Sequence, residues 1–154
     1  MSGADRRDPG TATPDGGGGT LVVGFDGSEA SARAARWAIQ LARPTRGHLV
    51  LVFAHHRNDR LAEPLTEEEV DSPARAVEYA MGKLVQEAQG VGVSAAPLVR
   101  EGAPAEVLLG IARETSAVGI VVGSRGLGGA ARLLLGSVSS RLVTAAAIPV
   151  TVVP

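Results

Sequence analysis

Residues 118–137 read VGIVVGSRGLGGAARLLLGS, an apolar run followed by a glycine-rich segment and the start of a helical pattern. The apolar run predicts a buried strand, and four glycines follow it within seven residues: Gly123, Gly126, Gly128 and Gly129. Nine residues then separate Gly126 from the pair formed by Gly136 and Ser137. Glycine reaches positive φ and lets backbone N–H groups come close to a ligand, and a helix N-terminus adds unpaired donors with a partial positive charge. The stretch therefore predicts a phosphate-binding loop between a strand and a helix that starts at Ser137.

The spacing of these glycines excludes two common phosphate loops. No Gly-Lys-Ser/Thr follows them, so the segment is not a Walker A loop. The glycine spacing also differs from that of the dinucleotide-binding fingerprint, which follows the first strand of its fold, whereas this loop follows the fourth apolar run. A tight turn that only allows the strand and helix to pack remains an alternative interpretation of the glycines.

Outside this stretch, the chain alternates between short apolar runs and helical patterns. The expected strands are 21–25, 48–54, 93–99, 118–122 and 149–153. The expected helices run from a cap at Ser28 to Pro44, from Pro73 to a stop at Gly90 and Gly92, from Pro104 to about Thr115, and from Ser137 to Ala146.

Strands that are apolar throughout and separated by helices predict an α/β fold, a doubly wound five-stranded parallel sheet with helices on both faces. Pro97 removes a ladder donor from the third strand, which favours an edge position and the strand order 3-2-1-4-5. Ligands bind such sheets where the winding reverses, beyond the carboxyl ends of the strands. We therefore expect Asp26 and Gly123 to face each other across one crevice.

Helical spacing also predicts which residues of two helices are buried. In the first helix one face collects Ala30, Ala34, Trp37, Ala38 and Leu41. In the second helix the apolar positions are Val77, Met81, Leu84, Val85 and Ala88.

Composition limits the class of protein. The 154 residues carry a net charge of −1, which argues against nucleic acid as a partner, and four aromatic residues are too few for a base-stacking platform. No cysteine is present, and no apolar stretch approaches the roughly 20 residues of a membrane helix. Residues 1–19 have almost nothing to bury and are expected to form a disordered tail before a single domain at 20–154. These features predict a cytoplasmic protein that does not associate with membranes.

Residues 20–154 resemble the universal stress protein family, in particular its ATP-binding members. The resemblance rests on the pattern Gly-x2-Gly-x9-Gly-Ser, met by Gly123, Gly126, Gly136 and Ser137. Supporting segments are VVGFDGSEAS at 22–31, REGAPAEVL at 100–108 and IPVTVV at 148–153. The resemblance implies the adenine nucleotide alpha hydrolase-like form of the fold and a nucleotide-dependent stress-response regulator.

The ligand implied by the resemblance is ATP, with ADP or AMP as alternatives and Mg²⁺ as an accompanying ion. Asp26, with Gly24 beside it, would lie near the nucleoside, and Ala54 or a neighbour would hold the adenine. The segment from Gly123 to Gly129, with Ser124, Arg125, Gly126 and Gly128, would wrap the ribose and the start of the phosphate chain. N–H and hydroxyl donors to the outer phosphates would come from Gly136, Ser137, Val138 and Ser139.

The resemblance also implies a homodimer formed through the last strand, 149–153, whose β-branched, nearly uncharged edge favours pairing with another chain. The downstream protein partner is not indicated. One departure concerns the second strand, where Phe53 stands in place of a histidine that is common in the family. This departure leaves the adenine contacts less defined than the phosphate contacts.

Several of these residues also have a purely structural interpretation. Asp26 could only stabilise the turn before the first helix, and Arg125 and Arg132 could be solvated rather than bound to phosphate. The serines lack the G-x-S-x-G elbow of serine hydrolases. The adjacent His55 and His56 point opposite ways along a strand, which argues against a metal site.

No carboxylate is expected beside the outer phosphates, so we expect no enzyme activity beyond slow, incidental ATP hydrolysis. A protein-interaction module that binds no nucleotide is the alternative function.

Overall fold

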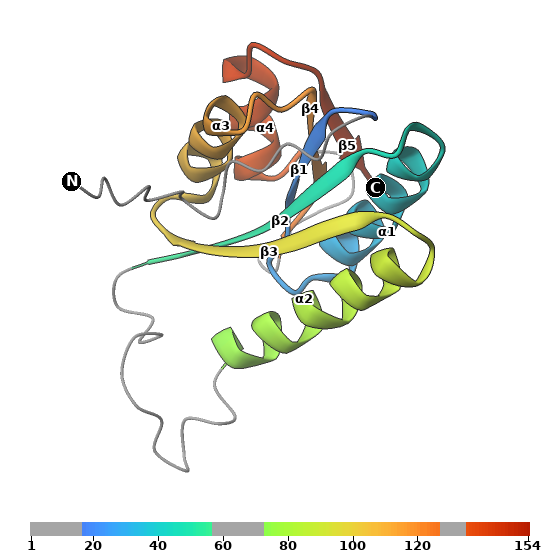
Figure 1. Ribbon diagram of the computed structural model, residues 1–154. Helices are drawn as coiled ribbons and strands as arrows, with labels where there is room; N and C mark the ends of the chain where they lie inside the picture. Colours follow the sequence, from blue (N-terminus) through green and yellow to red (C-terminus); the bar gives the residue numbers. More distant parts are fainter. Residues whose placement is uncertain (1–16, 57–72, 127–134) are drawn as a thin grey trace, which may run out of the picture.

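The computed structural model describes residues 17–56, 73–126 and 135–154. Five parallel strands form one sheet in the order β3-β2-β1-β4-β5, so the predicted order is confirmed (Figure 1). Val22 of the central strand aligns with Val50 on one side and with Ile120 on the other. The strands are β1 (Thr20–Gly24), β2 (His48–His55), β3 (Ser94–Glu101), β4 (Gly119–Gly123) and β5 (Val150–Val153).

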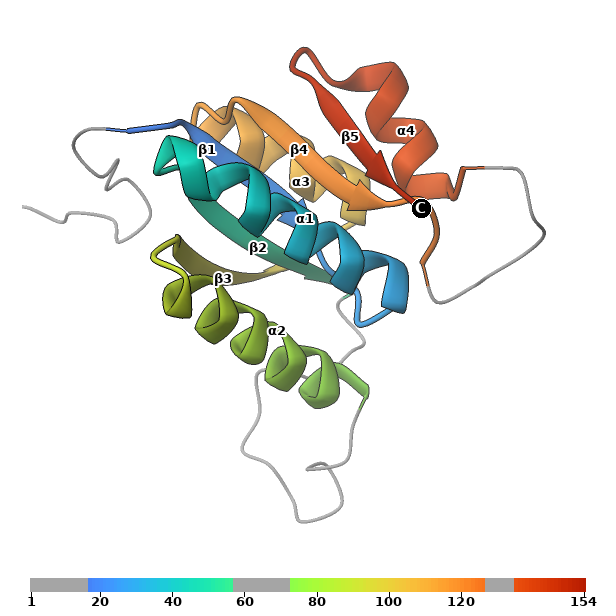
Figure 2. The ribbon, with the colours of Figure 1, turned by 90° about the vertical axis from the view of Figure 1, so that its right-hand side faces the viewer.

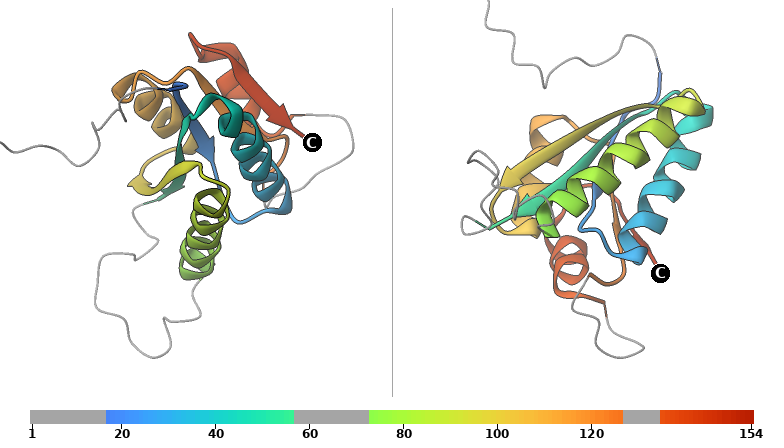
Figure 3. Two further views of the ribbon diagram at one scale, coloured as in Figure 1. Left: turned by 45° about the vertical axis from the view of Figure 1, so that its right-hand side comes forward. Right: turned by 90° about the horizontal axis from the view of Figure 1, so that it is seen from below.

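Helices cover both faces of the sheet, as predicted. They are α1 (Glu29–Thr45), α2 (Pro73–Gly90), α3 (Pro104–Glu114) and α4 (Ser137–Ala145). Figures 2 and 3 show α1 and α2 against one face and α3 and α4 against the other. The chain winds outward from β1 to β3, crosses back to β4 and continues outward to β5. The carboxyl ends of β1 and β4 therefore flank the point where the winding reverses.

Each strand buries residues on both sides, which explains its continuous apolar sequence. Val23, Leu51 and Val121 pack toward α1 and α2, in a core that includes Val77, Met81, Leu84 and Ala88 of α2. The fifth predicted residue of α2, Val85, is also buried. Val22 and Ile120 pack toward α3 and α4 in the second core. Each such fully buried aliphatic side chain stabilises the fold by about 1.5–3 kcal/mol.

The prediction for the buried face of α1 was wrong for its two bulky residues. Trp37 and Leu41 are 37% and 42% exposed. The helix instead approaches the sheet through small residues, all at most 1% exposed: Ala34, Ala35, Ala38 and Ala42. Alanines let the helix lie close to the strands, and the large side chains are then left at the border of the contact.

The helix ends agree with the capping residues except at Pro44. Ser28 caps α1, since its Oγ accepts a hydrogen bond from the N–H of Ser31 at 3.2 Å. Pro44 was expected to end α1, but it lies inside the last turn and the helix ends at Thr45. A proline there removes only one backbone donor from a turn whose carbonyls are already losing their partners.

Most of the predicted tail lies outside the described residues. Of the residues that are described, Gly18 donates its N–H to the carbonyl of Thr45, and Gly19 accepts from His48 at 3.3 Å. These contacts fasten the start of the domain to the end of α1 and the start of β2.

We expect Leu51→Ala to lower the free energy of unfolding by about 3 kcal/mol, because Leu51 is fully buried between the sheet and α1 and its truncation leaves a cavity. Leu41→Ala is the matched control and should lower it by less than about 1 kcal/mol, since Leu41 is 42% exposed. Urea denaturation of both variants measures the difference. Equal losses would contradict the packing described for α1 and β2.

Candidate functional site

A cavity of about 450 Å³ opens at the carboxyl ends of β1, β2 and β4. Its wall also includes the first turn of α3 and residues 135–139, where α4 begins. This is the position at which doubly wound sheets bind ligands. The cavity brings together ten of the predicted site residues: Gly24, Asp26, Ala54, Gly123, Arg125, Gly126, Gly136, Ser137, Val138 and Ser139.

The three remaining predicted site residues are Ser124, Gly128 and Gly129. Gly128 and Gly129 lie outside the described residues, as does Arg132. Ser124 is described, but it lies behind the wall and acts through its backbone. Its N–H donates to Val153 at 2.7 Å, and its carbonyl accepts from the N–H of Gly136 at 2.8 Å. Ser124 therefore ties the end of β4 both to β5 and to the start of α4.

Asp26 occupies the turn between β1 and α1, where its two carboxylate oxygens have different neighbours. Its Oδ1 accepts a hydrogen bond from the N–H of Ser28 at 2.9 Å, which stabilises the turn. Gly27, at φ +86°, completes this turn in a backbone conformation that other residues rarely adopt. The second oxygen, Oδ2, lies close to the backbone of Gly126, and both residues line the cavity. The turn interaction thus holds one oxygen and positions the other at the site.

The two glycines after β4 serve different purposes. At Gly123 an added Cβ would lie 2.7 Å from the backbone carbon of Ala30 and 2.9 Å from the nitrogen of Ser31. The packing interpretation therefore holds for Gly123, because the first turn of α1 rests directly on it. At Gly126 an added Cβ would lie 2.6 Å from Asp26 Oδ2. Gly126 is the residue that allows the β4 loop to approach the carboxylate.

The N-terminus of α4 presents free backbone donors to the cavity. Gly136 is the N-cap and makes no side-chain cap bond. In the described part of the chain, no acceptor is bound by the N–H groups of Ser137, Val138 and Ser139. By contrast, Ser28 at the start of α1 occupies such a donor with its own hydroxyl. A serine, threonine or aspartate at 136 would do the same at α4, so glycine leaves these donors available.

The hydroxyl of Ser139 differs from its predicted use. Ser139 is 2% exposed, and its Oγ–H lies 3.1 Å from the carbonyl of Gly136 and 3.3 Å from that of Ser124. This hydroxyl holds the two ends of the β4–α4 segment together. The side-chain donor of Ser139 is thus engaged within the protein.

An apolar wall on the β2 side was missed by the sequence analysis, apart from Ala54. Val52, Pro104 and Leu108 line the cavity there. The pattern that could have revealed it is the start of α3 at Pro104, which the strand order places over the ends of β2 and β1. Phe53, the departure from the family pattern, packs into the opposite core and does not line the cavity.

Charged groups are sparse at the site. Asp26 is the one carboxylate and Arg125 the one cation among the described residues of the cavity wall. Across residues 17–56, 73–126 and 135–154, no group of three His, Asp or Glu side chains is placed to hold a metal ion. None of the helices described there combines the length and apolarity needed to cross a membrane.

Comparison with known sequences gives a match along nearly the whole chain. The model of the universal stress protein family matches residues 19–154. A universal stress protein of Thermus aquaticus is 33% identical over 139 residues, which cover 87% of this chain and 97% of the relative. A universal stress protein of Mycobacterium tuberculosis is 33% identical over 141 residues, covering 87% and 94%.

Solved structures show the same fold. The universal stress protein UspA of Lactobacillus plantarum has a TM-score of 0.73 at 21% identity and covers 88% of this chain and 97% of its own. A universal stress protein solved in complex with cAMP has a TM-score of 0.66 at 28% identity and covers 90% and 98%. An Arabidopsis thaliana member with AMP bound shares the fold at a TM-score of 0.67 and 18% identity, covering 88% and 91%. On the family match and these relatives, this chain belongs to the universal stress protein family.

Proposed function

We propose that this protein binds an adenine nucleotide, with ATP as the preferred ligand, in the cavity between β1 and β4. The observation that carries the proposal is the convergence of Asp26 and the first turn of α4, whose glycine N-cap makes no side-chain bond, on one cavity. Backbone donors at a helix N-terminus suit phosphate, and a carboxylate suits the hydroxyls of a ribose. The cAMP complex of a relative at 28% identity supports an adenine nucleotide as the ligand class.

The distribution of groups gives the bound nucleotide a direction. The base would lie against the apolar wall of Val52, Ala54 and Leu108, where it loses contact with water. The ribose would then face Asp26, and the phosphates would extend to Gly136 and the first turn of α4. Mg²⁺, which prefers phosphate oxygens and water, would enter with the phosphates rather than occupy a protein site of its own.

We further propose that the protein binds ATP without efficient turnover. Hydrolysis needs a positioned water and a nearby acid or base. Asp26 is the one carboxylate of the described cavity wall, and it lies in the β1–α1 turn while the free donors lie on α4. In this arrangement the carboxylate belongs to the nucleoside end, and hydrolysis is slow and incidental.

The proposed regulatory form is a homodimer through β5. Within the described residues β5 bonds to β4 on one side, and its four residues are all half-buried. An apolar edge strand of this kind pairs readily with another chain. Nucleotide occupancy would then alter the stability of the dimer and its choice of protein partner in the stress response.

Millimolar ATP with Mg²⁺ should raise the melting temperature by several degrees. A ligand that binds only the folded state at about 100 times its Kd stabilises it by about 2.7 kcal/mol. Differential scanning fluorimetry with ATP, ADP, AMP and GTP measures the shift and its preference. No shift with any adenine nucleotide, and none retained on native purification, would reject nucleotide binding and favour the interaction module.

Gly126→Val should weaken ATP binding by more than about tenfold, because the new side chain displaces the Asp26 carboxylate. Arg125→Ala should weaken it by less than about fivefold, since a solvated charge contributes little. Gly82→Val on α2, where a Cβ meets nothing within 4 Å, is the matched control. Isothermal titration calorimetry ranks the three variants. A larger effect at Arg125 than at Gly126 would contradict a phosphate site built from backbone groups.

Gly136→Ser should weaken ATP binding while changing the free energy of unfolding by less than about 1 kcal/mol. The backbone at 136, with φ −62° and ψ 166°, is open to residues other than glycine. The new Cβ would lie 3.3 Å from the carbonyl oxygen of Ser124, which a shift of a few tenths of an ångström relieves, and the new hydroxyl would accept from the N–H of Val138 or Ser139. Titration calorimetry and urea denaturation of the same variant separate the two effects. Unchanged affinity would show that these donors do not contact the ligand.

A further inference from the structure

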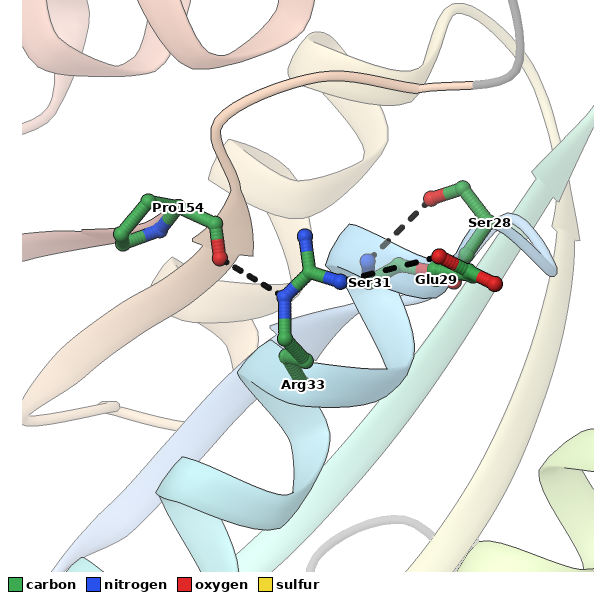
Figure 4. Close-up of polar contacts among 5 residues, drawn as sticks. All are labelled: Ser28, Glu29, Ser31, Arg33 and Pro154. Atoms are coloured by element: carbon green, nitrogen blue, oxygen red, sulfur yellow. Dashed lines mark hydrogen bonds and ion pairs between the residues drawn. The ribbon is translucent and has the colours of Figure 1, made fainter.

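We infer that Arg33 is a positioning residue for the phosphate end of the site, although it lies outside the cavity wall. Its Nε donates a hydrogen bond at 2.8 Å to the backbone oxygen of Pro154, which is 121 residues away in the sequence (Figure 4). This contact fastens the end of β5 to α1. The inference rests on the proposed function and names a residue that sets the geometry of that same site.

The end of β5 needs such an anchor. β5 has four residues and, in the described part of the chain, one neighbouring strand. A strand this short makes few backbone hydrogen bonds, so a side-chain contact at its end adds to its order. The other ion pair of Arg33, to Glu29, is 3.9 Å long, and the Glu29 side chain is 97% exposed, so it contributes little. The contact with Pro154 is therefore the interaction that orders the Arg33 side chain.

A chain of hydrogen bonds leads from this anchor to the site. Val153, next to Pro154, accepts from the N–H of Ser124 at 2.7 Å. The carbonyl of Ser124 in turn accepts from Gly136, the N-cap of α4, at 2.8 Å. Beyond Gly136 lie the free N–H groups assigned to phosphate. Loss of order at Pro154 would thus reach α4 through two backbone hydrogen bonds.

The same helix holds both strands that carry the β4–α4 segment. The first turn of α1 rests on Gly123 at the end of β4, through Ala30 and Ser31. Arg33 follows within one helical turn and contacts the end of β5. Figure 4 shows the guanidinium group of Arg33 extending from α1 toward Pro154, beside the Ser28–Ser31 cap. α1 therefore sets the relative position of β4 and β5 at the edge where the donors are displayed.

Hydrogen exchange of the nucleotide-free protein tests this coupling directly. Arg33→Ala should speed exchange of the Ser124 and Gly136 amides by about fivefold, the effect of losing one typical hydrogen bond. Arg33→Lys, which keeps a charged donor, should restore part of the protection. Arg36→Ala is the matched control, since Arg36 also projects from α1, is similarly exposed and pairs instead with Glu87 of α2 at 3.0 Å.

Nucleotide affinity gives the second readout. Arg33→Ala should raise the Kd for ATP by about fivefold and leave the Kd for adenosine unchanged, because only the phosphate end depends on Ser124 and Gly136. Arg36→Ala should change neither value. Equal losses for ATP and adenosine, or exchange rates that match those of Arg36→Ala, would overturn the inference. Failure of the wild-type protein to bind any adenine nucleotide would reject the proposed function instead, and hydrogen exchange would still decide whether Arg33 orders the segment.

Discussion

The backbone of α1 lies so close to Gly123 that no side chain fits between them. This contact fixes the distance between the first helix and the fourth strand, and the rest of the site depends on it. The β1–α1 turn, with Asp26, is brought beside the β4 loop because its helix starts there. The alanines that follow along α1 continue the same close approach to the sheet. The contact between α1 and Gly123 therefore brings the walls of the cavity together without any contribution from a ligand.

The N-termini of α1 and α4 differ in how their backbone N–H groups are bound. At α1 the hydroxyl of Ser28 takes up a backbone donor, and the end of the helix is satisfied by the protein itself. At α4 the glycine N-cap makes no side-chain bond, no acceptor in the described part of the chain binds the first N–H groups, and residues 136–139 line a cavity. A glycine at the N-cap leaves a helix less stable than serine or aspartate would by only a few tenths of a kcal/mol. The difference is consistent with a ligand that completes α4 and stabilises it on binding.

Much of this architecture could be predicted because apolar strand patterns alternate with helical patterns along the whole domain. Five apolar runs, the helix starts at Ser28, Pro73 and Pro104, and Pro97 at an edge were sufficient for the sheet order. Periodicity could not show that α1 packs through its alanines, since Trp37 fits the same helical face and only the helix–sheet distance excludes it. Leu108 was recognised as apolar, but its place in the cavity wall depends on where α3 crosses the sheet. That position is a property of the whole fold rather than of any local segment.

The glycine motif itself combines three separate physical requirements. Gly123 is needed for packing and Gly126 for close approach to Asp26. The φ of Gly136, −62°, does not require glycine, although an added Cβ would lie in tight contact, 3.3 Å, with the carbonyl oxygen of Ser124. A glycine at this position also makes no side-chain cap bond. The sequence alone cannot distinguish these requirements, because glycine satisfies each of them in the same way, by having no side chain. A change at Gly123 therefore alters the fold and the site together, whereas changes at Gly126 and Gly136 act on the site. Only the last two positions can report on what the cavity binds.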